Sequence, residues 1–497
     1  MQSPAPSNRP AAARPVVAMA GTFDISNFGD ALFPVLARWR LAELADEVIA
    51  LSPTAGLPIW RDSLPVRVLE DFHRSDEPCD LVLLGGGDIV HLRATPPGFY
   101  DDGGYSRWSA YASLWGGAAL LAHSRGCPLA WNAPGVPEPL GAELGEFLVG
   151  EGSPAAYVSV RDHSSLDNLP ASARSAVQVV PDTLVETASM WPRGEWLASD
   201  CRRVFNELTG SPPPERFVTV HVNGFATPTD STEAMAAAIE HWCRLWKASA
   251  VFVCPGLVHQ DPRWVEPVMG ALIARGTGAA KLVVETSMRD LVAVLAHSCG
   301  YLGSSMHGFV VSSSYGVPAM AVMPRDNPAQ IKLSGHMELC SWRGQRLWAS
   351  WQDLAEGLRA APAADLDLEL MVRESSGYLA RFQTDLDRHW ERVAGCVGSL
   401  GPAGTPPVGS SWLRSWPMWS PLGRQVATRL TQEFCGDLRE QAARTGVLQE
   451  KLQSERDKTK KLRAKLIESR AERQRLRSSW AWRIARWLWS LEKRVRR

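Results

Sequence analysis

Three segments of this sequence place small, polar or titratable residues directly after a short apolar run. Asn27–Asp30 (NFGD) follows one run, the triplet Gly85–Gly87 follows a second, and Ser304–Gly308 (SSMHG) follows a third. If the runs are strands of doubly wound sheets, these residues lie at the strand carboxyl ends, where such sheets bind ligands. Their types suit the binding of an anion beside a titratable imidazole.

The three segments also read as helix starts. Asn27 can cap a helix, whose first backbone N–H groups can then hold an anion. The glycines leave no side chain in the way of a ligand. A helix start disfavours imidazolium at His307, whereas a bound phosphate or carboxylate would favour its protonation. Each segment alone is equally consistent with a structural role, because glycine turns after strands are common and a lone histidine is usually structural.

The elements that must position these residues alternate between strands and helices. Segments such as 30–45 and 232–249 have helical spacing. The short runs are rich in Val, Leu and Ile and lack polar alternation, so both faces of each strand are expected to be buried, as in parallel sheets. The expected strands are Val16–Ala20, Leu81–Leu84, Leu129–Asn132, Tyr157–Val160, Val177–Val180, Phe217–Val222, Ala250–Val253, Leu282–Glu285, Gly300–Gly303 and Ala319–Met323.

This rhythm predicts the α/β class, with two Rossmann-like doubly wound domains. The SPPP stretch at Ser211–Pro214 is a natural break between them. We place the N-terminal domain at 14–210 and the C-terminal domain at 214–398.

The rest of the chain has a different character. Residues 399–425 are rich in Gly, Pro and Ser, which predicts a linker; its tryptophans Trp412, Trp416 and Trp419 would pack on the body or contact a membrane. Residues 430–479 predict a long helix with an imperfect heptad seam, either a coiled coil or a solvated single helix. Residues 480–497 combine four tryptophans with a basic face, which describes an interfacial amphipathic helix; nucleic-acid binding is the competing interpretation.

Charge follows the same division. The 497 residues hold 53 Lys and Arg against 53 Asp and Glu, a formal net charge of zero. Residues 430–497 carry 19 basic against 9 acidic residues, leaving 34 against 44 for the remainder. Such asymmetry suggests a tail with its own partner.

Nine scattered cysteines without a C-x-x-C pair argue against a zinc site or disulfide framework and favour a reducing cytosol. We expect no signal peptide and no membrane-spanning helix.

The order of the motifs resembles that of the polysaccharide pyruvyl transferases, over about residues 16–345. The resemblance rests on order and spacing rather than on any single motif. The segments that carry it are Asn27–Leu32, Gly85–Asp88, Val160–Ser164, Val179–Asp182, Ser304–Gly308 and Gly316–Pro318. It implies two Rossmann-like domains facing a cleft, as in GT-B glycosyltransferases. It also implies transfer of a pyruvyl group from phosphoenolpyruvate to a sugar, forming a ketal.

The resemblance assigns roles to single residues. His307 becomes the acid that protonates the enol carbon, and Asp182 orients a partner or a sugar hydroxyl. Arg161 holds the anionic groups of the donor, although an ion pair with Asp162 is an alternative. The other expected binding residues are Asn27, Gly29, Asp30, Gly85, Gly86, Gly87, Ser304, Ser305, Gly308, Arg325 and Lys332.

One position departs from the family. Many members have Arg-x-His at the third motif, and here Ser305 stands where that arginine would be. One clamp for the donor's anionic groups is therefore missing, which leaves the donor open. Arg325 or Lys332, just after the expected strand Ala319–Met323, would be the replacements.

Three functions remain after this step. The first is a pyruvyl transferase acting on an envelope polysaccharide or its lipid-linked precursor, without metal or cofactor. The second is a GT-B-like glycosyltransferase using a nucleotide sugar, and the third is an inert membrane-associated scaffold. We expect a cytoplasmic protein, peripheral at the inner face of the plasma membrane, that forms homo-oligomers through the coiled coil and binds no nucleic acid.

Overall fold

A computed structural model describes residues 14–398, apart from 57–59, 94, 96–99, 101–109, 141–154, 224–230, 260, 283–286, 326, 343–345 and 361–367. The chain divides into two compact units, 1–430 and 431–497, and all described residues belong to the first. The predicted linker, coiled coil and basic helix (399–425, 430–479 and 480–497) lie outside the described residues. None of the described helices is long and apolar enough to cross a bilayer.

The first sheet has six parallel strands in the order β3-β2-β1-β4-β5-β6. Alternate residues of β1 belong to different core clusters, so both faces of the sheet are buried. Helix α1 (Phe28–Arg40) covers one face, and α3 (Ala110–Arg125) covers the other. The strands are β1 Val16–Ala20, β2 Glu47–Ser52, β3 Val66–Val68, β4 Leu81–Gly85, β5 Leu129–Asn132 and β6 Ala155–Tyr157.

The second sheet repeats this pattern in the order β11-β10-β9-β12-β13-β14, again all parallel. Helices α8 (Thr232–Trp246) and α13 (Trp351–Ala360) pack on one face, and α10 (Met288–His297) and α11 (Met306–Ser314) pack on the other. The strands are β9 Phe217–His221, β10 Ser249–Val253, β11 Ala279–Leu282, β12 Tyr301–Gly303, β13 Ala319–Val322 and β14 Leu347–Trp348.

Both sheets therefore have the doubly wound order 3-2-1-4-5-6, and the α/β prediction with parallel sheets is confirmed. The direction of the strand order reverses between β1 and β4 in the first sheet and between β9 and β12 in the second. The three motifs lie at the carboxyl ends of strands at these two switch points.

Several local predictions were wrong in detail. The expected strand 157–160 is interrupted at Val158. Its second part, β7 (Ser159–Val160), pairs only with β8 (Gln178–Val179) in a separate small sheet. Strand β11 begins at Ala279, earlier than expected, and strands β2, β3 and β14 were not predicted. Helix α1 begins at Phe28 and ends at Arg40, before the expected 45.

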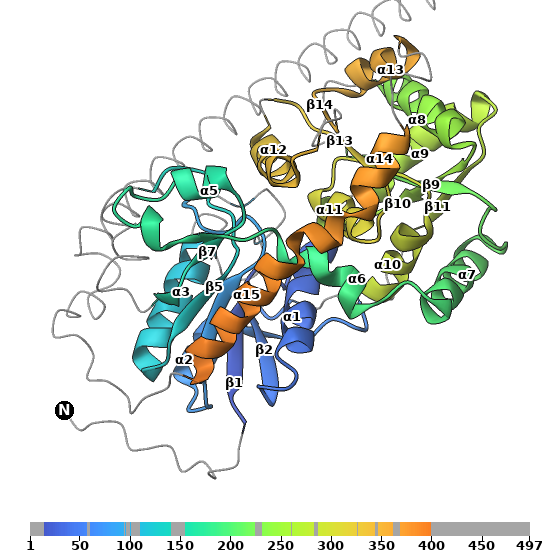
Figure 1. Cartoon of the computed structure of the whole chain (residues 1–497). Helices are drawn as coiled ribbons and strands as arrows, with labels where there is room; N and C mark the ends of the chain where they lie inside the picture. Colours follow the sequence, from blue (N-terminus) through green and yellow to red (C-terminus); the bar gives the residue numbers. More distant parts are fainter. Residues whose placement is uncertain are drawn as a thin grey trace, which may run out of the picture. The chain divides into compact units, whose positions relative to one another are not determined.

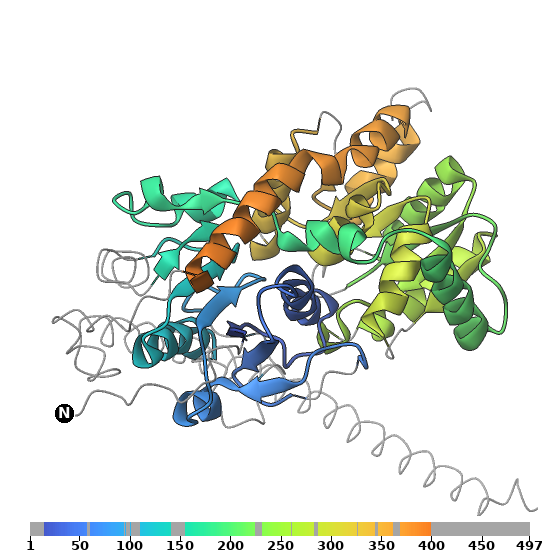
Figure 2. The ribbon, with the colours of Figure 1, turned by 60° about the horizontal axis from the view of Figure 1, so that its bottom comes forward.

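The last described helix, α15 (Tyr378–Gly398), returns to the first sheet. His389 Nε2 lies 3.0 Å from Asn132 Oδ1, and Trp390 donates to Glu186 at 2.6 Å. Figures 1 and 2 show α15 running from the second half of the unit across to β5 and β6. Residues expected in the domain 214–398 thus contact the other sheet, and the domain boundaries themselves stay a prediction.

The remaining helices are α2 Leu69–Arg74, α5 His163–Asp167, α6 Thr187–Met190, α7 Glu195–Thr209, α9 Asp261–Ala274, α12 Pro328–Cys340 and α14 Leu368–Ser376, with 3-10 turns η1 Arg174–Ala176, η2 Thr183–Glu186 and η3 Leu257–His259.

Candidate active site

Backbone contacts join the start of α1 to the loop after β10. Asn27 forms an antiparallel bridge with Gly256. The amide of Phe28 donates to the carbonyl of Pro255 at 2.8 Å, and Val258 N donates to Ser26 O at 3.2 Å. The first motif is therefore held against the second sheet's half of the unit.

Asn27 caps α1 as predicted, because its Oδ1 accepts from Gly29 N at 3.2 Å. Two of the first amides of α1 are thus already hydrogen-bonded, to Asn27 and Pro255, and are not free to hold an anion. The space above Gly29 is filled by the imidazole of His307. The first motif consequently supports a side chain of the third.

His307 lies in the first turn of α11 and is only 8% exposed. Ser305 caps this helix by accepting from Gly308 N at 3.2 Å. Gly308 in turn lies against Tyr301, whose hydroxyl a Cβ would meet at 2.5 Å. Ser305, standing where the family arginine would be, thus serves as a helix cap. The first amides of α11 have no carbonyl one turn earlier, so this end favours an anion.

His307 faces Asp182. Their Nε2 and Oδ2 atoms are 3.8 Å apart, and neither atom has a hydrogen-bond partner among the described residues. Asp182 is fixed by its other oxygen, which accepts from Leu184 N at 3.0 Å at the start of η2. The sequence predicted both residues, and the structure brings them together.

Burial sets the pKa values of this pair. It lowers the pKa of His307 well below its usual range, with further lowering by Lys332 and Arg161. Burial also raises the pKa of Asp182, although Arg161 opposes the rise. Without a bound anion the imidazole is therefore neutral, and it can act as an acid only after a ligand raises its pKa.

Arg161 is 1% exposed and lies between two carboxylates. Its Nη2 is 3.2 Å from Asp88 Oδ1, and its Nε is 3.5 Å from Asp162 Oδ2. Burial lowers the pKa of the guanidinium, but Asp88 and Asp162 outweigh burial and raise it overall. The alternative of a pair with Asp162 is thus observed, together with a pair to Asp88 that we did not predict. Asp88 is the last residue of the G-G-G-D motif, so its place directly after the glycines could have marked it as a site residue.

The glycine triplet shapes the loop after β4. Gly86 and Gly87 have φ of 79° and 76°, in the left-handed region that favours glycine. Gly85 backs onto Asn132, and Gly86 backs onto the ring of Phe33. The triplet therefore packs tightly against protein groups and directs Asp88 toward Arg161.

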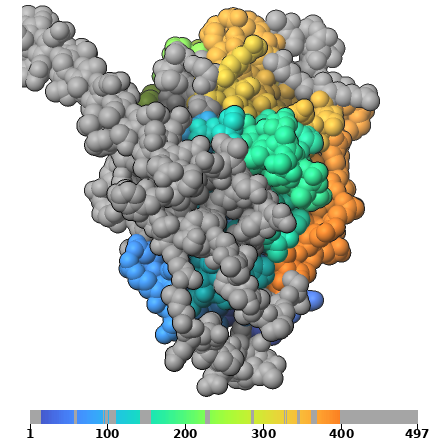
Figure 3. Space-filling view, turned by 90° about the vertical axis from the view of Figure 1, so that its left-hand side faces the viewer, coloured from blue at the N-terminus to red at the C-terminus, as the bar shows by residue number. Residues whose placement is uncertain are grey.

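Asp30 and Lys332 belong to the same cluster. Burial raises the pKa of Asp30 to about 7, with Lys332 opposing and Asp182 adding to the rise. Burial lowers the pKa of Lys332, while Asp88, Asp30 and Asp182 oppose that change. Helix α12, which carries Lys332, neighbours α5, and both reach the face seen in Figure 3.

Of the two proposed replacements for the missing arginine, Lys332 is therefore the one whose charge, after burial, affects the pKa values of His307 and Asp182. Arg325 is exposed on the turn after β13.

Ser304 has a different partner from the rest of its motif. Its Oγ lies 3.3 Å from Nδ1 of His221, at the carboxyl end of β9. His221 was not among the predicted residues, although its place at the same sheet edge was a signal in the sequence.

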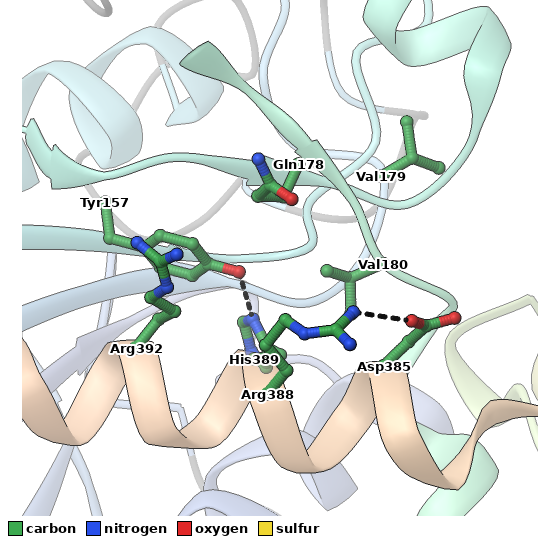
Figure 4. A pocket seen from close by; sticks show the side chains of 8 residues that line it. All are labelled: Tyr157, Gln178, Val179, Val180, Asp385, Arg388, His389 and Arg392. Carbon is green, nitrogen blue, oxygen red and sulfur yellow. Dashed lines mark hydrogen bonds and ion pairs between the residues drawn. The ribbon is translucent and has the colours of Figure 1, made fainter.

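A small pocket elsewhere is unsuited to a sugar. It lies between the small sheet and α15 and has a volume of about 30 Å³, room for about one water. Figure 4 shows Tyr157 and His389 hydrogen-bonded within it, with Arg388 paired to Asp385. It holds none of the predicted site residues.

No cluster of three or more His, Cys, Asp or Glu suited to a metal occurs in the described part of the chain.

The chain belongs to the polysaccharide pyruvyl transferase family, whose model matches residues 27–327, more than half of the sequence. Membership in this family indicates a transferase. A comparison with curated protein sequences finds no significant match.

Solved structures give weaker likenesses. A putative UDP-N-acetylglucosamine 2-epimerase from Listeria monocytogenes is 13% identical, with a TM-score of 0.45 over 80% of this chain and 99% of that one. HepE from Anabaena, in complex with UDP, is 13% identical with a TM-score of 0.45 over 78% and 100%. The UDP-GlcNAc 2-epimerase from Neisseria meningitidis, bound to UDP-GlcNAc, is 11% identical with a TM-score of 0.42 over 76% and 99%.

Proposed function

We propose that this protein transfers a pyruvyl group from phosphoenolpyruvate to a sugar of an envelope polysaccharide or its precursor, forming a ketal. The observation that carries the proposal is the pairing of His307 with Asp182 beside Lys332 and Arg161, at the edge where the family's motifs converge. A GT-B-like facing of two domains, 14–210 and 214–398, is part of the proposal.

Binding of the donor would allow His307 to become protonated. Phosphoenolpyruvate placed by Lys332 and the N-terminus of α11 would bring negative charge next to His307. That charge raises the pKa of the imidazole, which then protonates the enol carbon. Asp182, 3.8 Å from Nε2, stabilises the imidazolium form.

The remaining steps follow from the positive charge that protonation creates at the neighbouring carbon. A sugar hydroxyl attacks that carbon, phosphate leaves, and a second hydroxyl closes the ketal. Because its guanidinium is occupied by two carboxylates, Arg161 holds Asp88 and Asp162 in place rather than binding the donor directly. Lys332 therefore carries more of the anion binding than the family pattern implies.

The test is phosphate release from phosphoenolpyruvate with candidate glycan acceptors, together with detection of the ketal. We expect His307→Gln to reduce turnover about 10²-fold or more, the usual contribution of a general acid. The matched control His241→Gln, on α8, is expected to keep wild-type activity. Wild-type turnover in His307→Gln would refute the assigned role of His307.

A nucleotide-sugar glycosyltransferase is the second candidate, favoured by Ser305 standing in place of the arginine clamp. Thermal unfolding distinguishes the two functions. Protection by phosphoenolpyruvate and not by a nucleotide supports pyruvyl transfer, and the reverse supports glycosyl transfer.

We further propose that the chain acts in the cytoplasm at the inner face of the plasma membrane. Residues 480–497 would hold it at anionic lipid, and 430–479 would join protomers. These proposals rest on tryptophan content, basic charge and heptad spacing in the sequence.

A further inference from the structure

A second chain of buried polar groups lies at the carboxyl edge of the second sheet, and the reaction described above does not use it. Ser304 Oγ is 3.3 Å from His221 Nδ1, and His221 Nε2 is 3.0 Å from Asp261 Oδ2. The three residues are 6%, 3% and 0% exposed, in that order. They come from the ends of β12 and β9 and from the first residue of α9.

The hydrogen bonds fix the direction of this chain. Asp261 accepts from Gly256 N at 2.7 Å and from Asn223 Nδ2 at 3.1 Å, so both of its oxygens act as acceptors. His221 must then donate to Asp261 from Nε2, which leaves a lone pair on Nδ1 of the neutral ring. The hydroxyl of Ser304 donates to that lone pair. A proton accepted by Ser304 can thus move to His221, with Asp261 stabilising the resulting imidazolium.

This chain adjoins the His307 cluster. Ser304 precedes the cap of the helix that carries His307. Gly256, whose amide orients Asp261, is bridged to Asn27, and Gly29 from the same turn lies against His307. His259 lies beside Gly256, and burial lowers the pKa of both His259 and His307, with Lys332 adding to the change in each.

We propose that Ser304, His221 and Asp261 form a proton relay that takes the proton from the attacking sugar hydroxyl. The inference rests on the proposed pyruvyl transfer and adds a base to it. As the acceptor oxygen forms its bond to the cationic carbon, its proton passes to Ser304 Oγ while the serine proton passes to His221 Nδ1.

The protons of the whole reaction then balance. One proton is delivered to the enol carbon from His307, and two are released by the two hydroxyls. The proton that reaches His221 returns through Ser304 to an oxygen of the leaving phosphate, and the proton of the second hydroxyl restores His307, so both histidines end in their starting states. Only Ser304 touches the acceptor in this scheme; His221 and Asp261 act through it.

Four substitutions test the relay in the full chain, assayed with phosphoenolpyruvate and a glycan acceptor. Ser304→Ala and His221→Gln are expected to lower kcat about 10²-fold or more, with the KM for the donor little changed. Asp261→Asn should also lower kcat. Ser304→Thr keeps the hydroxyl and should retain most activity.

The pH profile separates a relay from a structural hydrogen bond. A relay base makes kcat depend on pH, so the low-pH limb of the wild-type kcat profile should be lost in His221→Gln. His259, Asp261, Ser304 and Tyr301 face the same region, so His259→Gln serves as the control that keeps the limb. In protein with ¹⁵N-labelled histidine, the N–H proton of His221 should resonate downfield and lose that shift in Asp261→Asn.

The outcomes are distinct. Wild-type kcat and an unchanged pH limb in Ser304→Ala and His221→Gln would overturn the relay and leave pyruvyl transfer standing. Equal loss in Ser304→Ala and Ser304→Thr would also overturn it, because a hydroxyl would then be irrelevant. A wild-type protein that releases no phosphate with any acceptor would refute pyruvyl transfer itself, and the relay with it.

Discussion

A Cβ placed on Gly29 would lie 1.7 Å from Nδ1 of His307, so the glycine of the first motif leaves the space that the histidine of the third motif occupies. Phe33, one turn further along α1, meets the imidazole edge-on with ring centroids 5.6 Å apart. The side chain of His307 therefore packs against helix α1, which covers the first sheet, whereas its backbone belongs to α11, which packs on the second sheet.

We expect Gly29→Ala to displace His307 and to lower both stability and activity. Overpacking a buried contact of this kind costs about 1–3 kcal/mol, and a misplaced catalytic group can lose about 10²-fold in rate. Chemical denaturation and the phosphate-release assay measure the two effects. Gly270→Ala, in the middle of α9 with open space around it, is the control and should be neutral or slightly stabilising. Equal behaviour of the two variants would show that Gly29 is not needed for the position of His307.

Asp30 gives a pH-dependent prediction. Its pKa is raised from 3.8 to about 7 by burial, so the folded protein binds more protons than the unfolded chain between these values. Stability contributed by this group is therefore lost as pH rises through that window. Asp30→Asn should raise the free energy of unfolding near pH 8, by up to about 4 kcal/mol, and change it little near pH 3.5, below both pKa values.

Denaturant unfolding at the two pH values checks this, with the exposed Asp76→Asn as the control that changes neither. A gain in Asp30→Asn that is the same at both pH values would contradict the assigned protonation.

The sequence predicts the site residues that come directly after strands. It does not predict which residues form hydrogen bonds or ion pairs with them. His307, Arg161 and Asp182 follow the carboxyl ends of strands, where ligands bind in doubly wound sheets, although these strands belong to different sheets. The pairing of Asp88 with Arg161 and of His221 with Ser304 depends on contacts between segments far apart in the sequence. No periodicity in the chain encodes such contacts.

Length explains two of the three missed strands. Strands β3 and β14 have three and two residues, all half-buried, and both lie at the edge of a sheet. A strand this short has too few residues to show a hydrophobic pattern. The predicted strand 157–160 was split because β7 leaves the main sheet to pair with β8, a tertiary choice that apolar residues alone do not specify.

Removing the charge of Arg161 should destabilise the fold strongly. Arg161→Met would leave the buried Asp162 and the half-buried Asp88 without their cation; for a buried pair this typically costs about 3–5 kcal/mol. Arg161→Lys should recover part of the loss, because one ammonium cannot reach both carboxylates as the guanidinium does. Urea denaturation measures the series. Arg174→Met, which breaks a more exposed pair with Asp167, should cost less than about 1 kcal/mol. Similar losses in Arg161→Met and Arg174→Met would refute the structural role of Arg161.

Deleting residues 478–497 is expected to abolish binding to anionic vesicles while leaving catalysis on a water-soluble acceptor largely intact. The reason is charge: residues 1–429 carry 34 basic against 44 acidic residues, so the body alone is repelled from an anionic surface. Each basic residue of the tail near such a surface contributes about 1 kcal/mol, and the tryptophans add interfacial contact.

Vesicle sedimentation with and without anionic lipid measures the binding, and added salt should weaken it. A full-length variant with Arg483, Arg486, Lys493 and Arg494 changed to Gln keeps the tryptophans and isolates part of the electrostatic attraction. It should bind anionic vesicles more weakly than the intact chain, with a smaller preference for anionic over neutral lipid. Vesicle binding that is the same for the intact and the truncated chain would show that another part of the protein contacts lipid.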